Sequence, residues 1–206
     1  MEFYLNFKQE YDNTVLRNLY STKLNVETGD LSVLISEGFS MESLVTLFRE
    51  IPTDINFAQK IIPNISLICS SGYTSCVYKL DGQSGRSYAV KVIKDNSVLP
   101  SIDLKASVKV EMVRRKEFEN IACDAIHRTI YASSDNGVIV TEWLNGVDIR
   151  KAYPMGIDIL PATLNSLLDV EMKGIFEWDM TLDNIIYNDD GNPFFSTLVL
   201  LTDSTL

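Results

Sequence analysis

The feature that most constrains the fold is a pair of short apolar segments separated by a glycine-containing turn. Residues 88–93, Tyr-Ala-Val-Lys-Val-Ile, alternate in character and are rich in β-branched side chains, and residues 76–80, Cys-Val-Tyr-Lys-Leu, precede them. The turn between them is Asp-Gly-Gln-Ser-Gly at 81–85. Such runs favour β-strands, and two of them joined by a short turn of this kind predict a hairpin. We therefore expect an antiparallel sheet.

The residues before this hairpin predict helices. Apolar side chains recur at helical spacing within 11–19 and again within 41–48, the second group after a candidate cap at Ser40. We assign residues 1–63 to an N-terminal helical extension that packs or docks and carries no chemistry.

The middle of the chain, residues 64–146, has the pattern of a sheet with one helix. The predicted strands are 65–68, 76–80, 88–93, 128–132 and 137–144, and the predicted helix is 104–122.

Residues 147–206 form the third part. A helix is predicted at 159–172, entered through Pro161, with its apolar side made of Leu160, Leu164, Leu167 and Leu168. A hairpin is expected after it, pairing residues 184–187 with the apolar run 198–201 around a long loop.

Charge and composition exclude several functions. The 206 residues carry a net charge of −10, which argues against a nucleic-acid partner because phosphate backbones are bound by clustered Lys and Arg. Basic residues gather between Arg86 and Lys116 and acidic ones after Asp169, a division that suits an anionic nucleotide and a divalent cation. No apolar run approaches the roughly 20 residues of a membrane span. Three cysteines and one histidine make a zinc site improbable, and we expect a cytoplasmic protein of a bacterial or host cell.

Lys91 lies inside the alternating run, where an unpaired ammonium is costly to bury. Its frame, Tyr-Ala-Val-Lys-Val-Ile, resembles the strand that carries the nucleotide lysine of protein kinases. The resemblance implies that Lys91 holds the α and β phosphates of ATP and that Ala89 belongs to the nucleotide site.

Residues 67–78 resemble the glycine-rich loop of protein kinases, closing on Val77 and a tyrosine. Of the three glycines only Gly72 is present, and Ser70 and Ser75 occupy the other two places. Serine is small enough to admit phosphate, but it adopts positive φ less readily than glycine does. We therefore expect this loop to bind the phosphates less tightly than the usual glycine-rich loop.

Two further segments resemble kinase elements. The helix at 104–122 would supply the acid that pairs with Lys91; Glu117 matches the family best, and Glu111 is the alternative with the more usual sequence distance. Residues 138–146 resemble the hinge, where the backbone of Glu142 and Leu144 would bond the adenine edge and Trp143 would add apolar surface.

The segment 174–187, Gly-Ile-Phe-Glu-Trp-Asp-Met-Thr-Leu-Asp-Asn-Ile-Ile-Tyr, resembles the kinase catalytic loop. The resemblance implies that Asp179 is the base and that Asn184 binds Mg²⁺. Glu177 and Trp178 replace the usual histidine and arginine. This form is most similar to early protein kinases of short-tailed phages and, less closely, to compact kinases that bacteria inject into hosts.

The second metal ligand of the family lies about a dozen residues after the asparagine. Counted without gaps, that position falls near Thr197, which cannot replace an anionic ligand of Mg²⁺. The apolar run 198–201 continues through Thr202 to Asp203, which is the candidate if the preceding loop is longer.

Together these features predict an α+β chain with a minimal protein-kinase-like fold. An antiparallel-sheet N-lobe with its helix would be followed by a much reduced C-lobe and preceded by extra helices. The function implied by the resemblance is ATP- and Mg²⁺-dependent phosphorylation of Ser or Thr in a protein substrate. A pseudokinase that binds a partner and nucleotidyl transfer are the alternatives, and the sequence leaves open whether the chain forms a homodimer.

Overall fold

The computed structural model describes residues 27–50, 55–69, 75–93, 112, 115, 128–148, 152, 154, 159–172 and 185–195. The helices in this part are α2 (Ser32–Ser36), α3 (Met41–Glu50), α4 (Ile55–Ile61) and α7 (Ile159–Met172). The strands are β1 (Glu27–Gly29), β2 (Ile65–Cys69), β3 (Ser75–Asp81), β4 (Ser87–Ile93), β5 (Thr129–Ser133), β6 (Val138–Glu142), β7 (Val147–Asp148), β8 (Ile185–Tyr187) and β9 (Pro193–Phe195). The chain is therefore α+β, as expected.

The larger sheet has six strands in the order β1-β5-β6-β4-β3-β2, and every neighbouring pair is antiparallel. The predicted β3–β4 hairpin is confirmed, with Asp81 paired to Ser87 at its closed end. Its turn is closed by the N–H of Gly82, which donates to the carbonyl oxygen of Arg86 at 2.8 Å. Gly85 has a φ of +86°, a conformation that glycine adopts without strain.

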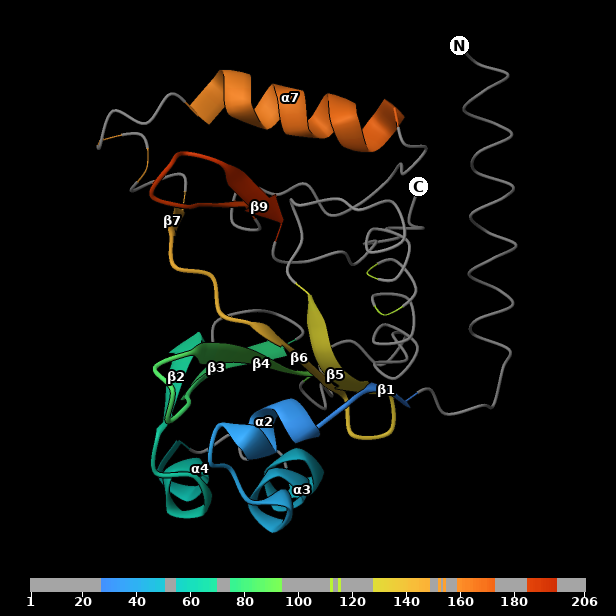
Figure 1. Cartoon of the computed structure of the whole chain (residues 1–206), viewed down its shortest axis with the longest axis vertical. Helices are drawn as coiled ribbons and strands as arrows, with labels where there is room; N and C mark the ends of the chain where they lie inside the picture. Colours follow the sequence, from blue (N-terminus) through green and yellow to red (C-terminus); the bar gives the residue numbers. More distant parts are fainter. Residues whose placement is uncertain are drawn as a thin grey trace, which may run out of the picture.

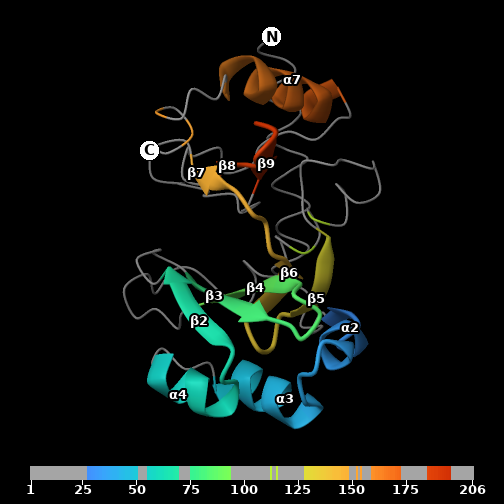
Figure 2. The ribbon, with the colours of Figure 1, turned by 60° about the vertical axis from the view of Figure 1, so that its left-hand side comes forward.

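One face of this sheet packs against the N-terminal helices (Figures 1 and 2). Alternate side chains of β3 and β4 point toward the helices and join one core: Cys76, Tyr78, Leu80, Tyr88, Val90 and Val92. The helical part contributes Leu34, Phe39, Leu44, Leu47, Phe48, Ala58 and Ile62. The ring of Phe48 stacks on that of Tyr131, with centroids 5.5 Å apart. Helices α2–α4 thus share a hydrophobic core with the sheet.

Helix α3 begins where the sequence predicts. The hydroxyl oxygen of Ser40 accepts a hydrogen bond of 3.0 Å from the backbone N–H of Ser43, the contact of an N-cap residue. Leu44, Leu47 and Phe48 are buried along one side of the helix.

Strand β1 was not anticipated, since only helices were predicted before residue 64. Its residues Glu27, Thr28 and Gly29 pair with Ser133, Ala132 and Tyr131 at the edge of the sheet. Three residues are too few to show an alternating pattern. The strand conformation of these residues therefore depends on their pairing with the edge of β5.

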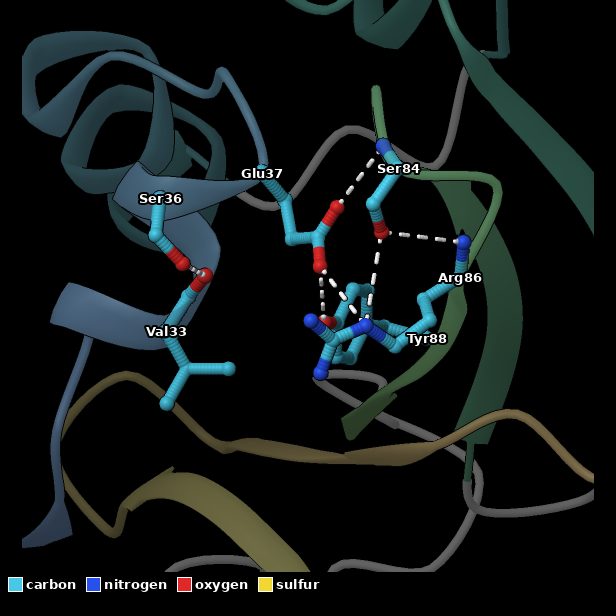
Figure 3. Close-up of polar contacts among 6 residues, drawn as sticks. All are labelled: Val33, Ser36, Glu37, Ser84, Arg86 and Tyr88. Carbon is cyan, nitrogen blue, oxygen red and sulfur yellow. Dashed lines mark hydrogen bonds and ion pairs between the residues drawn. The ribbon is translucent and has the colours of Figure 1, made fainter.

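A buried carboxylate joins the helices to the β3–β4 turn (Figure 3). Glu37, directly after α2, accepts hydrogen bonds from the backbone N–H of Ser84 and the hydroxyl of Tyr88, both at 3.1 Å. The Nε of Arg86 lies 3.1 Å from the same carboxylate. A Cβ at Gly82 would lie 2.6 Å from Glu37 Oε2, so this close approach requires glycine.

The second sheet contains β7, β8 and β9 in that order and lies beside α7 (Figure 1). The hydroxyls of Thr163 on α7 and Tyr187 on β8 lie 2.8 Å apart. The predicted strand after residue 184 is present, but its partner is Pro193–Phe195 and not the run 198–201, which lies outside the described residues. The turn at 188–192 is tight because Asn188 Oδ1 accepts from the backbone N–H groups of Asp190 and Asn192.

Helix α7 has its predicted bounds but not its predicted orientation. Leu160, Leu164 and Leu168 are 65%, 49% and 54% exposed, whereas Leu167 is half-buried, so three of the four leucines of the expected apolar side face outward. On its other side the helix faces the small sheet, where Thr163 contacts the Tyr187 hydroxyl of β8 and the helix lies against β9.

Candidate functional site

Lys91 lies in the middle of the larger sheet. In register it stands between Val77 of β3 and Ile139 of β6. Its strand neighbours Val90 and Val92 are in the core with helices α2–α4, and successive side chains of a strand point to opposite faces. Lys91 therefore lies on the opposite face, which we call the Lys91 face.

Two more of the predicted nucleotide residues share the Lys91 face. Val77 is directly opposite Lys91, and Ala89 precedes Lys91 by two residues on β4. In the next row of the sheet Ala89 pairs with Lys79 on one side and Thr141 on the other. Directly paired residues have Cβ atoms about 5 Å apart, so the structure brings Val77, Ala89 and Lys91 together. Each of the three is half-buried.

The loop predicted to hold phosphates connects β2 to β3. Ser75 is the first residue of β3 and pairs with Ile93, at the end of β4 that lies beyond Lys91. The β2–β3 register shifts between Leu67 and Cys69, immediately before the loop. Ser70 and Gly72 lie outside the described residues.

The predicted hinge follows β6. Glu142, the last residue of that strand, pairs with Tyr88, and the N–H of Trp143 donates to the carbonyl oxygen of Ser87 at 2.9 Å. Trp143 has committed its N–H to β4, whereas no backbone–backbone hydrogen bond of Leu144 to another described residue is present.

Sequence reasoning missed the role of Trp143 and of Lys79. The Lys79 ammonium lies 5.4 Å from the centroid of the Trp143 indole ring, so Trp143 makes a cation–π contact in addition to offering apolar surface. No sequence pattern signalled this pair, because the two residues are 64 positions apart in the chain and only the sheet register brings them together.

The remaining predicted site residues fall outside the described residues: Glu117, its alternative Glu111, Asp179, Asn184, and Asp203 with the alternative position Thr197. Two described residues within the predicted helix 104–122, Met112 and Arg115, are helical and 6% and 4% exposed. Ile185 and Tyr187, which follow Asn184, are buried in β8.

No helix in the described ranges combines the length and apolar character of a membrane crossing. These ranges contain no group of three His, Cys, Asp or Glu side chains arranged to hold a metal ion.

Comparisons with known proteins give limited similarity. No protein-family model matches the chain, and no curated protein matches it. The solved structure described as "PpkA-294 apo form" is similar at 15% identity and a TM-score of 0.46, over 64% of this chain and 57% of its own length. A complex of Rv3197 with erythromycin from Mycobacterium tuberculosis is similar at 16% identity and a TM-score of 0.49, over 97% of this chain and 67% of its own.

Proposed function

We propose that the chain is an ATP- and Mg²⁺-dependent protein kinase that phosphorylates Ser or Thr. The observation that supports this most is the register of β3, β4 and β6. It places Lys91 between Val77 and Ile139, on the face of the sheet turned away from helices α2–α4, with the hinge candidate at the end of the neighbouring strand. The six-stranded antiparallel sheet is compatible with a kinase-like N-lobe.

In this proposal the sheet, the hinge segment and the loop between β2 and β3 bind the nucleotide. Val77 and Ala89 contact the adenine ring through their apolar side chains, and the backbone groups of Leu144, together with the carbonyl of Glu142, bond its edge. Lys91 donates to the α and β phosphates from the next row of the sheet. Ser70, Gly72 and Ser75 belong to the loop over the phosphates.

The transfer step is assigned to residues near the end of the chain. Asp179 accepts the proton of the substrate hydroxyl, and Asn184 and Asp203 would hold Mg²⁺. The metal, when bound, neutralises charge on the β and γ phosphates. Glu117, or Glu111 in its place, fixes Lys91. The resemblance of the Trp-Asp-Met motif favours a phage or bacterial effector kinase that acts on host proteins in the cytoplasm, alone or as a homodimer.

Nucleotide binding is the first test. If the parent protein binds ATP with Mg²⁺, a ligand at 100 times its dissociation constant stabilises the fold by about 2.7 kcal/mol, measurable as a rise in Tm. Lys91→Met removes the ammonium and should abolish most of this shift. Lys60→Met, on the exposed side of α4, is the matched control and should keep it. A parent protein whose Tm does not respond to ATP and Mg²⁺ would refute the proposal.

Phosphoryl transfer is the second test. Asp179→Ala should reduce transfer from γ-labelled ATP to a mixture of Ser- and Thr-containing peptides by on the order of 10²- to 10³-fold while nucleotide binding persists. Transfer at the parent rate would show that Asp179 is not the base.

A pseudokinase is the second candidate, favoured by the serines at positions 70 and 75, where the family loop has glycine. A pseudokinase without Mg²⁺ ligands should show no stabilisation by ATP with Mg²⁺ and no transfer by the parent protein. Nucleotidyl transfer is distinguished by mass spectrometry, since the modified peptide would gain a nucleotide and not a phosphoryl group.

A further inference from the structure

Four residues form a closed ring of contacts where the β3–β4 hairpin meets the segment after β6. The Lys79 ammonium lies 5.4 Å from the centroid of the Trp143 ring and 2.9 Å from Asp81 Oδ1. The hydroxyl of Ser87 donates to the same Asp81 oxygen at 2.6 Å. The ring closes through the backbone, because the carbonyl oxygen of Ser87 accepts from the N–H of Trp143. We call Lys79, Asp81, Ser87 and Trp143 the hinge anchor.

The hinge anchor holds Trp143 by two independent contacts. Its backbone N–H donates a hydrogen bond to β4, and its indole ring makes a cation–π contact with Lys79 of β3. With both contacts in place, the position of the Trp143 Cα and its φ are restrained, because a change in either would break one of them. The point from which the chain continues to Leu144 is therefore held by both β4 and β3.

Charge within the anchor is balanced. The hydroxyl of Ser87, and next the Lys79 ammonium, lower the pKa of the Asp81 carboxyl, so the ion pair with Lys79 persists at neutral pH. Lys79 and Lys91 both lie on the Lys91 face, but in different rows: Lys79 pairs with Ala89, whereas Lys91 pairs with Val77. Lys79 thus lies one row nearer the β3–β4 turn than Lys91, where it contacts Asp81 and Trp143.

We propose that the hinge anchor positions the backbone of Leu144 for recognition of the nucleotide base, with Lys79 as its positioning residue. This inference rests on the proposed function, since it assumes that a base lies against Leu144. Lys79 touches neither the base nor the phosphates in this assignment. It acts through Trp143, and its loss weakens base recognition by allowing residues 143 and 144 to sample other orientations.

The expected effect is modest. Lys79 is 27% exposed and Asp81 53% exposed, so solvent screens their attraction. Because the Lys79 ammonium is partly solvated, its cation–π contact belongs to the weaker, solvent-exposed class. Losing both contacts of Lys79 should weaken base binding by about three- to tenfold.

The test compares adenosine, which has no phosphate, with ATP and Mg²⁺. Lys79→Met keeps the aliphatic stem and should weaken both ligands by the same factor, as measured by calorimetry. Lys91→Met should weaken ATP and leave adenosine unchanged. Lys79→Arg can pair with Asp81 and lie over Trp143, so it should restore parent affinity, and Lys60→Met is the control. Parent affinity for adenosine in Lys79→Met, or a loss confined to ATP, would overturn the inference.

A second measurement needs no ligand. Hydrogen exchange of the Trp143 amide, which is bonded to Ser87, should accelerate in Lys79→Met and return to the parent rate in Lys79→Arg. Unchanged exchange would show that Lys79 does not hold residue 143. If the parent protein binds neither adenosine nor ATP, the proposed function fails and the base-recognition role fails with it, while exchange still decides whether the ring orders residue 143.

Discussion

Glu37 is a charged side chain inside the hydrophobic part of the molecule. It is 2% exposed, yet it has three partners: the N–H of Ser84, the hydroxyl of Tyr88 and the guanidinium of Arg86. A buried carboxylate is tolerated when its oxygens are satisfied in this way. The Tyr88 phenol stays protonated and donates, because burial and then the Glu37 carboxylate raise its pKa.

The Glu37 cluster predicts a pH dependence of stability. The hydrogen bonds from Ser84, against the opposing effect of burial, lower the pKa of Glu37 below its ordinary 4.5. The unfolded chain therefore binds this proton at higher pH than the folded chain does. The stabilisation is fully present above about pH 4.5 and is lost as the pH falls through the lower folded value. Thermal melts across the acidic range should show a shallower pH dependence for Glu37→Gln than for the parent; equal slopes would contradict this assignment.

Tyr88→Phe isolates one bond of the same cluster. The ring stays buried while the hydroxyl that donates to Glu37 is removed, so the free energy of unfolding should fall by about 1 kcal/mol. Urea denaturation measures the change. An unaltered midpoint would mean that the contact is offset by solvent in the folded state.

At the scale of elements, α3 depends on its cap. Ser40→Ala leaves the N–H of Ser43 without its side-chain acceptor and should lower the free energy of unfolding by about 1 kcal/mol. Ser40→Gly should lower it by only a few tenths of a kcal/mol, since glycine lets water reach the helix end. The order of the two variants in urea denaturation is the test, and equal losses would argue against capping by the side chain.

Leucines of α3 and α7 should respond differently to truncation. Leu44 is fully buried in the core, and Leu44→Ala should cost about 2–5 kcal/mol. Leu164 is 49% exposed on the outer side of α7, and Leu164→Ala should change the free energy of unfolding by less than about 0.5 kcal/mol. A large loss at Leu164 would show that this side of α7 is covered in solution.

At the scale of the whole molecule, helices α2–α4 take the place of a second layer for the sheet. They cover Tyr78, Leu80, Tyr88 and Val90, which would otherwise be exposed to water (Figure 2). A chain that begins at residue 64 should therefore lose cooperative thermal unfolding, because a sheet with one apolar face uncovered does not fold stably. A sharp transition in that truncated chain would show that the helices are a separable appendage.

Much of the architecture was predictable because it is encoded locally. The alternation in 76–80 and 88–93 predicts strands, and a short glycine-containing turn leaves a hairpin as the simple connection. Ser40 and the spacing of Leu44 and Phe48 likewise predict α3, since capping and periodicity act within a few residues. These interactions do not depend on the rest of the chain.

What only the tertiary structure decided involves residues far apart in the sequence. Strand β1 exists because β5 offers it an edge, and α7 packs on the small sheet through the side that carries Thr163, which leaves Leu160, Leu164 and Leu168 exposed. The sequence alone marked Lys91 as unusual within an apolar strand, but the register of β3, β4 and β6 determined which side chains surround it. Local patterns determined which segments are helices and strands. Long-range pairing, which no short pattern records, determined which strands are neighbours and which side of each helix packs against a sheet.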